Sequence, residues 1–401
     1  MWKTWRAPHR ASCLLHPARR THTSDTRPFA AGDILLLRQK LDQTAPPILT
    51  RPLKSGLQLH THKGVLNHDD IIGKRVRDVV RTAPLRSGKA GTEYRLHHVK
   101  LEEYVRLSRR LVTPIYPADA NLIVDLLDLH VVPYSGNTPA NDGNERLEIL
   151  EAGTGHGALS LYLSRAIHAA NPPPPEAPGD ETVLDEWKAT RRAILHTIDC
   201  SAKFSNHASS IVAAFRRGMY HANIDFHATD VSAWTAKALA LRNQLPFLAH
   251  AFLDLPNADT HLGIVARALR TDGCLIVFNP SITQILDCVR RIREEGIGLE
   301  MENVLELGIN GGSGGREWNV RAVKPRGKKV VDEESDDGEM AAGIVESSDG
   351  EVDGPPREEA VREESNASDD WKTICRPKVG DRIVGGGFLG IWRKRRDMRD
   401  D

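Results

Sequence analysis

The sequence predicts an α/β protein built on a mostly parallel sheet that helices cover on both faces. Three observations support this fold class. Apolar strand-like runs alternate with helical segments from about residue 147 to residue 307. The run Leu147–Ala152 leads directly into a Gly-x-Gly-x-Gly turn, and a helix begins at Ala158. Acidic residues stand at the ends of successive strand-like runs, where ligands of such sheets bind.

Composition limits the class of protein further. At 401 residues and 40% hydrophobic content, the chain can bury a full core and is expected to hold two domains. No apolar run is long enough to span a bilayer, so no membrane association is expected. The five cysteines form no Cys-x-x-Cys pair, which indicates a reducing compartment without a disulfide framework. His60, His62 and His68 lack a further ligand at a familiar spacing, so no metal is expected.

The first 31 residues have the composition of a mitochondrial transit peptide. They hold six basic residues against one acid, Asp25, together with several serines and threonines. We therefore expect residues 1–31 to lie outside the fold and to direct the protein to the mitochondrial matrix. The alternative is a basic tail that binds RNA or nothing.

Residues 32–100 predict a small β domain, either a barrel or an open sheet. Short apolar runs alternate there with turn residues, and glycines separate them. The middle of the domain is basic, and such a surface would suit a polyanion, although an ordinary solvated face remains the alternative. The basic residues are Arg51, Lys54, Lys63, Lys74, Arg75, Arg77, Arg81, Arg86 and Lys89.

Residues 101–310 predict the main domain. Strands are expected over residues 147–152, 193–198, 223–228, 248–253, 274–278 and 299–307. Helices are expected over residues 101–110, 119–129, 203–217, 260–269 and 281–295, besides the helix that begins at Ala158. A turn at Thr271-Asp272-Gly273 is expected to precede the fifth strand.

The glycine turn predicts a ligand site. Glycine lets the backbone turn sharply and lets a ligand lie against the main chain beside a helix N-terminus. A dinucleotide site requires Gly-x-Gly-x-x-Gly, but here the third glycine comes one position early. Glu151 suits an amino group better than a pyrophosphate, so the spacing favours S-adenosylmethionine over a dinucleotide; a turn without a ligand is the alternative. The candidate cofactor-binding residues are Glu151, Ala152, Gly153, Thr154, Gly155, His156, Gly157 and Ala158.

Acids at three further strand ends extend this site. Asp199 ends the second strand, where a carboxylate accepts hydrogen bonds from a ribose diol. Thr229 and Asp230 follow the third strand, and Asp230 could bond the exocyclic amine of adenine. Asp254 follows the fourth strand. Each acid has an alternative role as a helix cap or loop residue.

The end of the chain changes character. Residues 311–375 are rich in glycine and acids and cannot bury enough apolar area to order themselves, so they are expected to form a disordered insertion. Residues 376–401 are expected to contribute a closing strand, over 387–392, and a basic tail.

With these pieces assembled, the chain resembles the catalytic subunit family of the tRNA (adenine-58-N1)-methyltransferases, with a fungal-type mitochondrial member as the expected subtype. Its more specific motifs are the Tyr-Pro-x-Asp, Asp-Leu-Pro and Phe-x-Pro sets. The matching stretches are His62-Lys63-Gly64, Ile115-Tyr116-Pro117, the glycine turn, Thr229-Asp230-Val231, Phe252–Pro256 and Phe278-Asn279-Pro280.

The resemblance implies a class I, Rossmann-like S-adenosylmethionine-dependent methyltransferase fold with a seven-stranded sheet and a small N-terminal β domain. It implies methyl transfer to N1 of adenine 58 in the T-loop of tRNA. It also implies a tetramer, either of identical chains or with a non-catalytic paralogue, and the nucleus as the alternative location. The residues it implies for the substrate are Thr113, Tyr116, Pro256 and Asn279.

We expect Asp254 to be the catalytic residue and to contact the cofactor as well. Adenine N1 is hidden in a paired or stacked base, so the enzyme must extrude the base. A carboxylate that accepts a hydrogen bond from the adenine N6 amine would raise the electron density at N1. Two alternatives stay open: a non-catalytic RNA-binding subunit that kept the fold, and a methyltransferase with another substrate.

Overall fold

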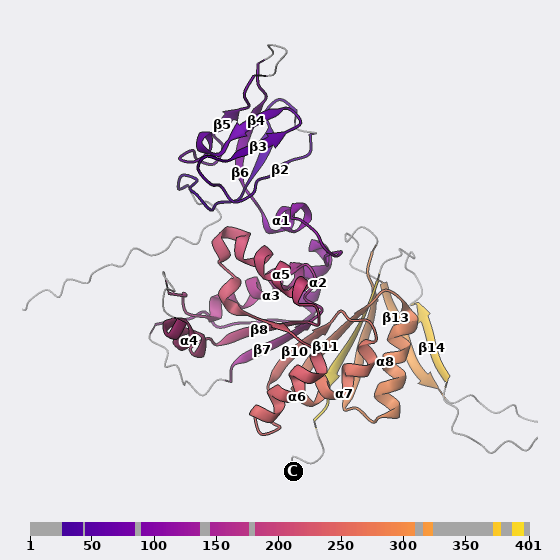
Figure 1. The fold of residues 1–401 in the computed structure, drawn as a ribbon. Coiled ribbons are helices and arrows are strands. Elements are labelled where there is room, and N and C mark those ends of the chain that lie inside the picture. Colours follow the sequence, from indigo (N-terminus) through magenta and orange to yellow (C-terminus); the bar gives the residue numbers. More distant parts are fainter. Residues whose placement is uncertain are drawn as a thin grey trace, which may run out of the picture.

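The computed structural model describes residues 26–42, 45–84, 90–136, 145–175, 181–308, 316–323, 372–377 and 387–396. These residues form a small β domain and a larger α/β domain, which the segment around α1 (Leu101–Leu107) connects (Figure 1). Arg86, Lys89 and most of the expected acidic insertion lie outside the described residues.

The N-terminal domain is a four-stranded antiparallel sheet with a separate hairpin. The sheet has the order β2-β1-β6-β5. Its strands are β1 (Leu35–Gln39), β2 (Ile48–Leu49), β5 (Val79–Arg81) and β6 (Glu93–His98), and the hairpin is β3 (Gln58–Thr61) with β4 (Gly64–Asn67). Alternating residues of β1 and β6 face one small core, in which Leu35, Leu37, Tyr94 and Leu96 are buried.

This domain begins earlier than residue 32. Phe29 is 2% exposed in the same small core, and its backbone bonds reach Lys74 and Gly73 at 2.7 and 2.8 Å. Arg27 bonds both carboxylate oxygens of Asp33. The basic composition of residues 1–31 concealed this, because one buried aromatic residue carries no periodic signal. The expected boundary after Ala31 is therefore corrected to one that leaves residues 26–31 in the domain.

The larger domain confirms the predicted fold class. Its sheet has the order β9-β8-β7-β10-β11-β15-β12, and β15 alone of these seven runs antiparallel to its neighbours. The strands are β7 (Leu147–Ala152), β8 (Ala193–Asp199), β9 (Ile224–Ala228), β10 (Leu248–Leu253), β11 (Leu269–Asn279), β12 (Leu299–Glu306) and β15 (Phe388–Lys394).

Helices cover both faces of this sheet (Figure 1). One face carries α1, α2 (Pro117–Leu126), α3 (Ala158–Ile167) and α5 (Ala202–Ala214). The other carries α6 (Val231–Leu241), α7 (Leu262–Ala268) and α8 (Ile282–Glu294). The remaining described helices are α4 (Glu181–Ala189) and the short 3₁₀ segments η1 (His68–Asp70), η2 (His168–Ala170), η3 (Phe215–Gly218), η4 (His221–Asn223) and η5 (Ala258–His261).

Two strands lie where no regular structure was expected. β13 (Arg316–Val323) and β14 (Lys372–Pro377) pair with each other, and β13 pairs with β12, so they extend the sheet beyond its seventh strand. The expectation of a disordered insertion over 311–375 is thus corrected at these two strands. The signal was weak because a long acidic stretch separates the two strands and dominates the composition of residues 311–375.

The expected turn at residues 271–273 is part of β11. The strand runs without interruption from Leu269 to Asn279, and the pairing with β10 shifts register between Leu248 and His250. Asp272 has a φ of 66°. A turn signal in the sequence thus corresponds to an irregularity within one strand, as glycine beside a left-handed residue often indicates.

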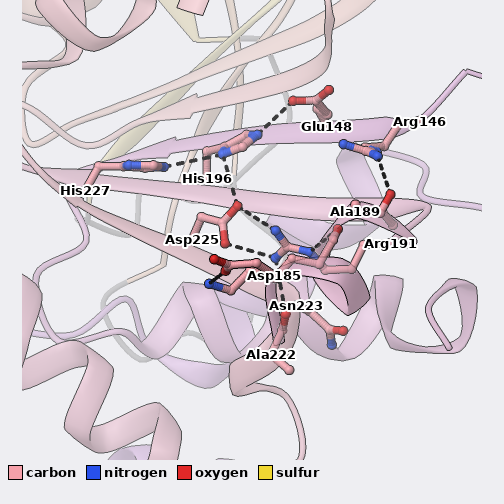
Figure 2. A network of polar contacts seen from close by, with 12 residues as sticks. Arg146, Glu148, Asp185, Ala189, Arg191, His196, Ala222, Asn223, Asp225 and His227 are labelled. Carbon is pink, nitrogen blue, oxygen red and sulfur yellow. Dashed lines mark hydrogen bonds and ion pairs between the residues drawn. The ribbon is translucent and has the colours of Figure 1, made fainter. Parts of the chain in front are cut away.

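A network of buried polar side chains stabilises the β7–β8–β9 end of the sheet (Figure 2). Arg191 donates to both oxygens of Asp225, at 2.9 and 2.8 Å. The His196 ring lies 2.8 Å from Glu148 and 3.4 Å from His227. Because these groups come from three neighbouring strands and the turn before β8, their pairing fixes the register of the sheet without exposing charge to the core.

Candidate functional site

The glycine turn lies at the carboxyl end of β7, against the end of β10. Gly153, Gly155 and Gly157 all have positive φ, at 95°, 51° and 80°. A Cβ atom on Gly153 would lie only 2.2 Å from the backbone oxygen of Asp254. The Asp254 N–H donates to the Ala152 carbonyl at 2.8 Å. Glycine at 153 is therefore required for the two strand ends to meet.

Glu151 lies beneath this turn and is 1% exposed. Its Oε2 accepts hydrogen bonds from Ser160 Oγ at 2.5 Å and Thr197 Oγ1 at 2.7 Å. Burial raises the pKa of Glu151 to about 7, which outweighs these bonds, and the nearby Asp254 carboxylate raises it further. Glu151 thus joins the turn to α3 and β8, and no cation neutralises it in the described part of the protein.

Asp199 lies at the carboxyl end of β8, as predicted. Its Oδ2 accepts the Gly155 N–H at 3.1 Å, and its Oδ1 accepts the Ser201 N–H at 2.8 Å, just before α5. Asp199 therefore lies directly against the glycine turn, with lone pairs left for a diol.

Asp254 follows β10 and is half-buried. Burial alone raises the pKa of this carboxyl to about 6. Within the described residues, its side chain has no hydrogen bond or ion pair. A partly buried carboxyl group without a partner is favourable only where a ligand supplies a hydrogen-bond donor or a positive charge.

Three neighbouring strands bring these acids to one place. β10, β7 and β8 lie side by side, and they deliver Asp254, Glu151 and Asp199 around a single turn. The chain order reverses between β7 and β10, and open α/β sheets bind their ligands at such a switch point. Two raised carboxyl pKa values without a neighbouring cation favour a ligand that carries positive charge or hydrogen-bond donors.

The end of β9 also reaches this edge. The Thr229 N–H donates to the Asp199 carbonyl at 3.0 Å. Asp230 is exposed and caps α6, because its side chain accepts the Ala233 N–H at 2.9 Å. In this structure Asp230 serves as the N-cap of α6, and its expected contact with adenine stays a prediction.

The extended segment between α1 and α2 borders the turn on another side. A Cβ on Gly155 would lie 3.3 Å from Val112. The His156 ring lies 3.1 Å from Ser108 Oγ, and burial with nearby positive charge lowers the pKa of His156 to about 4. These contacts hold the segment that carries two predicted substrate residues, Thr113 and Tyr116, both of them exposed.

The other two predicted substrate residues lie in different surroundings. Pro256 is exposed two residues after Asp254, at the same edge of the sheet. Asn279 is 2% exposed beside the Cys288 thiol of α8. Asn279 ends β11 at the carboxyl edge of the sheet, where the neighbouring β10 also ends, and its expected contact with the substrate stays a prediction.

The sequence analysis did not identify the four side chains that contact the predicted cofactor-binding residues. Ser160, Thr197, Ser108 and Val112 contact the turn through their side chains. Only Thr197 could have been found, because it pairs with Glu151 in the β7–β8 register. The other three come from segments whose approach depends on tertiary packing.

The described part of the chain offers neither a metal-binding cluster nor a membrane-spanning helix. No group of three His, Cys, Asp or Glu side chains there could hold a metal ion. None of the described helices is long and apolar enough to cross a membrane.

Comparison with known proteins gives sequence similarity to one enzyme group. A family profile described as "TrmI-like N-terminal" matches residues 42–76. The tRNA (adenine(58)-N(1))-methyltransferase TrmI of Thermus thermophilus is 29% identical over 279 residues, which cover 69% of this chain and 86% of that protein. The same enzyme from a second strain of Thermus thermophilus gives the same identity and coverage.

Solved structures show the fold. An S-adenosylmethionine-dependent O-methyltransferase from Thermotoga maritima superimposes with a TM-score of 0.53 at 16% identity, over 95% of this chain and 98% of that one. A tRNA (m1A58) methyltransferase TrmI from Aquifex aeolicus gives a TM-score of 0.47 at 18% identity, over 92% of this chain and 100% of that one. The chain therefore has the class I S-adenosylmethionine-dependent methyltransferase fold, and its sequence is similar to tRNA m1A58 methyltransferases.

Proposed function

We propose that this protein transfers a methyl group from S-adenosylmethionine to N1 of adenine 58 in the T-loop of tRNA. The observation that carries the proposal is that two acids, the buried Glu151 and the half-buried Asp254, lie at one glycine turn without a cation among the described residues. Similarity to the Thermus enzyme supports the choice of substrate.

The residues present fit S-adenosylmethionine. When bound, it supplies a methyl group on a positively charged sulfur. Glu151 and Asp254 offer the negative charge that a cationic ligand needs in a shielded site. Asp199 offers carboxylate lone pairs for a ribose diol, and the glycine turn offers bare main chain.

Asp254 is the residue that we assign to the adenine. Its carboxylate accepts a hydrogen bond from the N6 amine, which raises electron density at N1 and stabilises positive charge as it forms on the ring. It needs to be ionised for this task, and its pKa of about 6 leaves it ionised at neutral pH. Tyr116 and Thr113 stand on the neighbouring segment, where an extruded base would enter.

Methyl transfer to defined transcripts tests this proposal. Purified protein is incubated with S-adenosylmethionine that carries a labelled methyl group and with an unmodified tRNA transcript, and the modified base is mapped by mass spectrometry. We expect one labelled N1-methyladenine, at position 58, and no label in a transcript that carries uridine there. Label elsewhere, or in both transcripts alike, would refute the substrate; failure to bind S-adenosylmethionine in calorimetry would refute the cofactor.

We also propose a tetrameric assembly, either of identical chains or with a non-catalytic paralogue. The support is the family resemblance of the catalytic motifs, not a contact within this chain. Light scattering on the protein purified alone, and again after co-expression with candidate paralogues, distinguishes the two forms. A monomer in every preparation would contradict the assembly.

The proposed location is the mitochondrial matrix, with the nucleus as the alternative. The support is the basic composition of the first residues. A fluorescent fusion of the full chain is compared with one that lacks residues 1–25, which keeps the folded domain intact. Loss of mitochondrial signal in the shorter fusion is expected, and unchanged localisation would contradict a transit peptide.

A further inference from the structure

A cluster of charged side chains joins the two domains at Asp33. This aspartate precedes β1 in the N-terminal domain and is 5% exposed. Its Oδ1 accepts from Arg217 Nε at 2.7 Å and from Arg27 Nη2 at 2.9 Å. Its Oδ2 accepts from Arg27 Nη1 at 2.7 Å and from the Ala30 N–H at 2.8 Å. Asp33 is therefore fully engaged, and Arg217 is its partner from the other domain.

Arg217 reaches Asp33 from an unusual turn. After α5 ends at Ala214, Arg216, Arg217 and Gly218 all have positive φ, at 44°, 58° and 71°. A left-handed conformation costs a non-glycine residue about 1 kcal/mol or more, and two occur here in succession. Such strain persists only where surrounding contacts enforce it. The ion pair of Arg217 with Asp33 is one such contact, and the Arg216 guanidinium over the Phe215 ring is another.

α5, the helix that ends just before the Arg217 turn, begins at the candidate active site. Ser201, the N-cap of α5, donates its N–H to Asp199. Near the other end, the Ile211 carbonyl accepts from Tyr104 Oη at 2.7 Å, and the Tyr104 and Phe215 rings lie 5.1 Å apart. Tyr104 belongs to α1, which follows the N-terminal domain directly. α5 and the turn that follows it thus run from the acids of the site to the edge of the β domain (Figure 1).

The N-terminal domain presents the surface that suits a polyanion. Seven of the basic side chains in its middle are exposed, and they lie in the domain that Asp33 anchors. They are Arg51, Lys54, Lys63, Lys74, Arg75, Arg77 and Arg81. The angle between the two domains therefore decides where a phosphate backbone on this surface would lie relative to Asp254.

We infer that the Asp33–Arg217 ion pair is a positioning contact that sets this angle and so delivers bound tRNA to the active site. The inference rests on the proposed function for its substrate. Arg217 bonds Asp33 and, within the described residues, makes no hydrogen bond with the glycine turn or its acids. Its effect is on the placement of the tRNA, so it acts on tRNA use and not on the chemistry.

Steady-state kinetics with separate saturation of each substrate test this role. In Arg217→Ala, we expect the KM for tRNA to rise about tenfold, as loss of ~1.4 kcal/mol of positioning energy implies. We expect kcat at saturating tRNA and the Kd of S-adenosylmethionine to stay within about twofold of the wild type, because the acids of the site are unchanged. Arg217→Lys keeps the charge and is expected to recover part of the loss.

Arg216 provides the matched control. It is adjacent, exposed and equally left-handed, but its guanidinium lies 5.8 Å over the Phe215 ring and makes no bond with Asp33. Arg216→Ala is expected to leave the KM for tRNA unchanged. Equal effects of the two alanine variants, or a loss in kcat alone for Arg217→Ala, would overturn the inference.

A double-mutant cycle keeps the test falsifiable if one variant is unstable. Asp33→Asn, Arg217→Ala and the double variant are compared in tRNA binding by gel shift and in KM. A positioning pair predicts that the double variant is no worse than the worse single one. Additive effects would contradict the inference. A wild-type protein that does not methylate tRNA would instead contradict the proposed function, whatever the variants do.

Discussion

At the scale of single residues, the site is defined by acids that the described part of the protein does not neutralise. The pKa of Glu151 is raised to about 7 and that of Asp254 to about 6, in both cases chiefly by burial. A buried acid elsewhere in the chain has a different fate: the pKa of Asp33 is lowered to about 2, because two arginines outweigh its burial. Unlike Asp33, the two site acids have no cation beside them in the described residues, and a bound ligand with positive charge would stabilise their ionised forms.

The first prediction concerns pH and cofactor affinity. A cationic ligand binds the ionised acids best, so the affinity for S-adenosylmethionine is expected to rise as pH increases from about 5.5 to about 7.5, through the two raised pKa values. Calorimetry across this range measures it. Glu151→Gln is expected to weaken binding and flatten the upper part of the profile. A wild-type affinity that falls with pH would contradict this electrostatic account.

The same shift makes a second prediction, about stability. A carboxyl whose pKa is higher in the folded state stabilises the fold fully below its unfolded pKa, near 4.5 for Glu151. That contribution is lost as pH rises toward 7. The ligand-free protein is therefore expected to lose more stability between about pH 5 and about pH 7 than Glu151→Gln does. Urea unfolding at each pH gives the comparison, and identical slopes for the two proteins would contradict it.

Gly153 carries a third prediction. In Gly153→Ala, the new Cβ would meet the Asp254 carbonyl at 2.2 Å on a backbone with a φ of 95°, so the ends of β7 and β10 must separate. We expect a loss of ~3 kcal/mol in unfolding free energy, from overpacking and backbone strain together. Gly296→Ala is the control, because Gly296 has a φ of 60° but open space around it. It should cost only ~1 kcal/mol; equal losses would show that the close approach is unimportant.

At the scale of elements, the sequence predicted most of the α/β domain and part of the rest. Strands from Leu147 to Leu253 were predictable because continuous apolar runs end in turn residues. β13 and β14 were missed because they flank a long acidic stretch and pair with each other across it. Asn279 lies at the end of β11, where the family motif placed it, beside the Cys288 thiol of α8, and its role toward the substrate stays a prediction.

The start of the first domain gives a fourth prediction, at this scale. A chain that begins at Thr26 keeps Phe29 in the core, whereas a chain that begins at Gly32 loses Phe29 and Arg27. Removal of a buried Phe side chain costs about 3–5 kcal/mol. We expect the shorter chain to melt at a clearly lower temperature and the longer one to match the full protein. Phe29→Ala in the longer chain isolates the aromatic contribution, and equal melting temperatures for all would contradict the revised boundary.

At the scale of the whole molecule, the surface that suits tRNA and the residues assigned to methyl transfer belong to different domains. The glycine turn and its acids lie where the strand order reverses, and the basic N-terminal domain is joined to that edge through α1 and α5. The gathering of Glu151, Asp199 and Asp254 at one edge of the sheet could be predicted, because acids at the ends of neighbouring parallel strands lie together. The hydrogen bonds of Ser160 with Glu151 and of Ser108 with His156 could not be predicted, because tertiary packing brings these residues together.

The most direct measurement of the central claim is the single-turnover rate of methyl transfer by Asp254→Asn. The amide keeps the shape of the side chain but removes the charge that we assign to the adenine N6 amine. The account predicts a rate lower by ~100-fold, the usual effect of losing one electrostatic contact to the reacting group, while the protein stays folded and still binds S-adenosylmethionine. A variant as fast as the wild type would contradict the assignment of Asp254 and the account built on it.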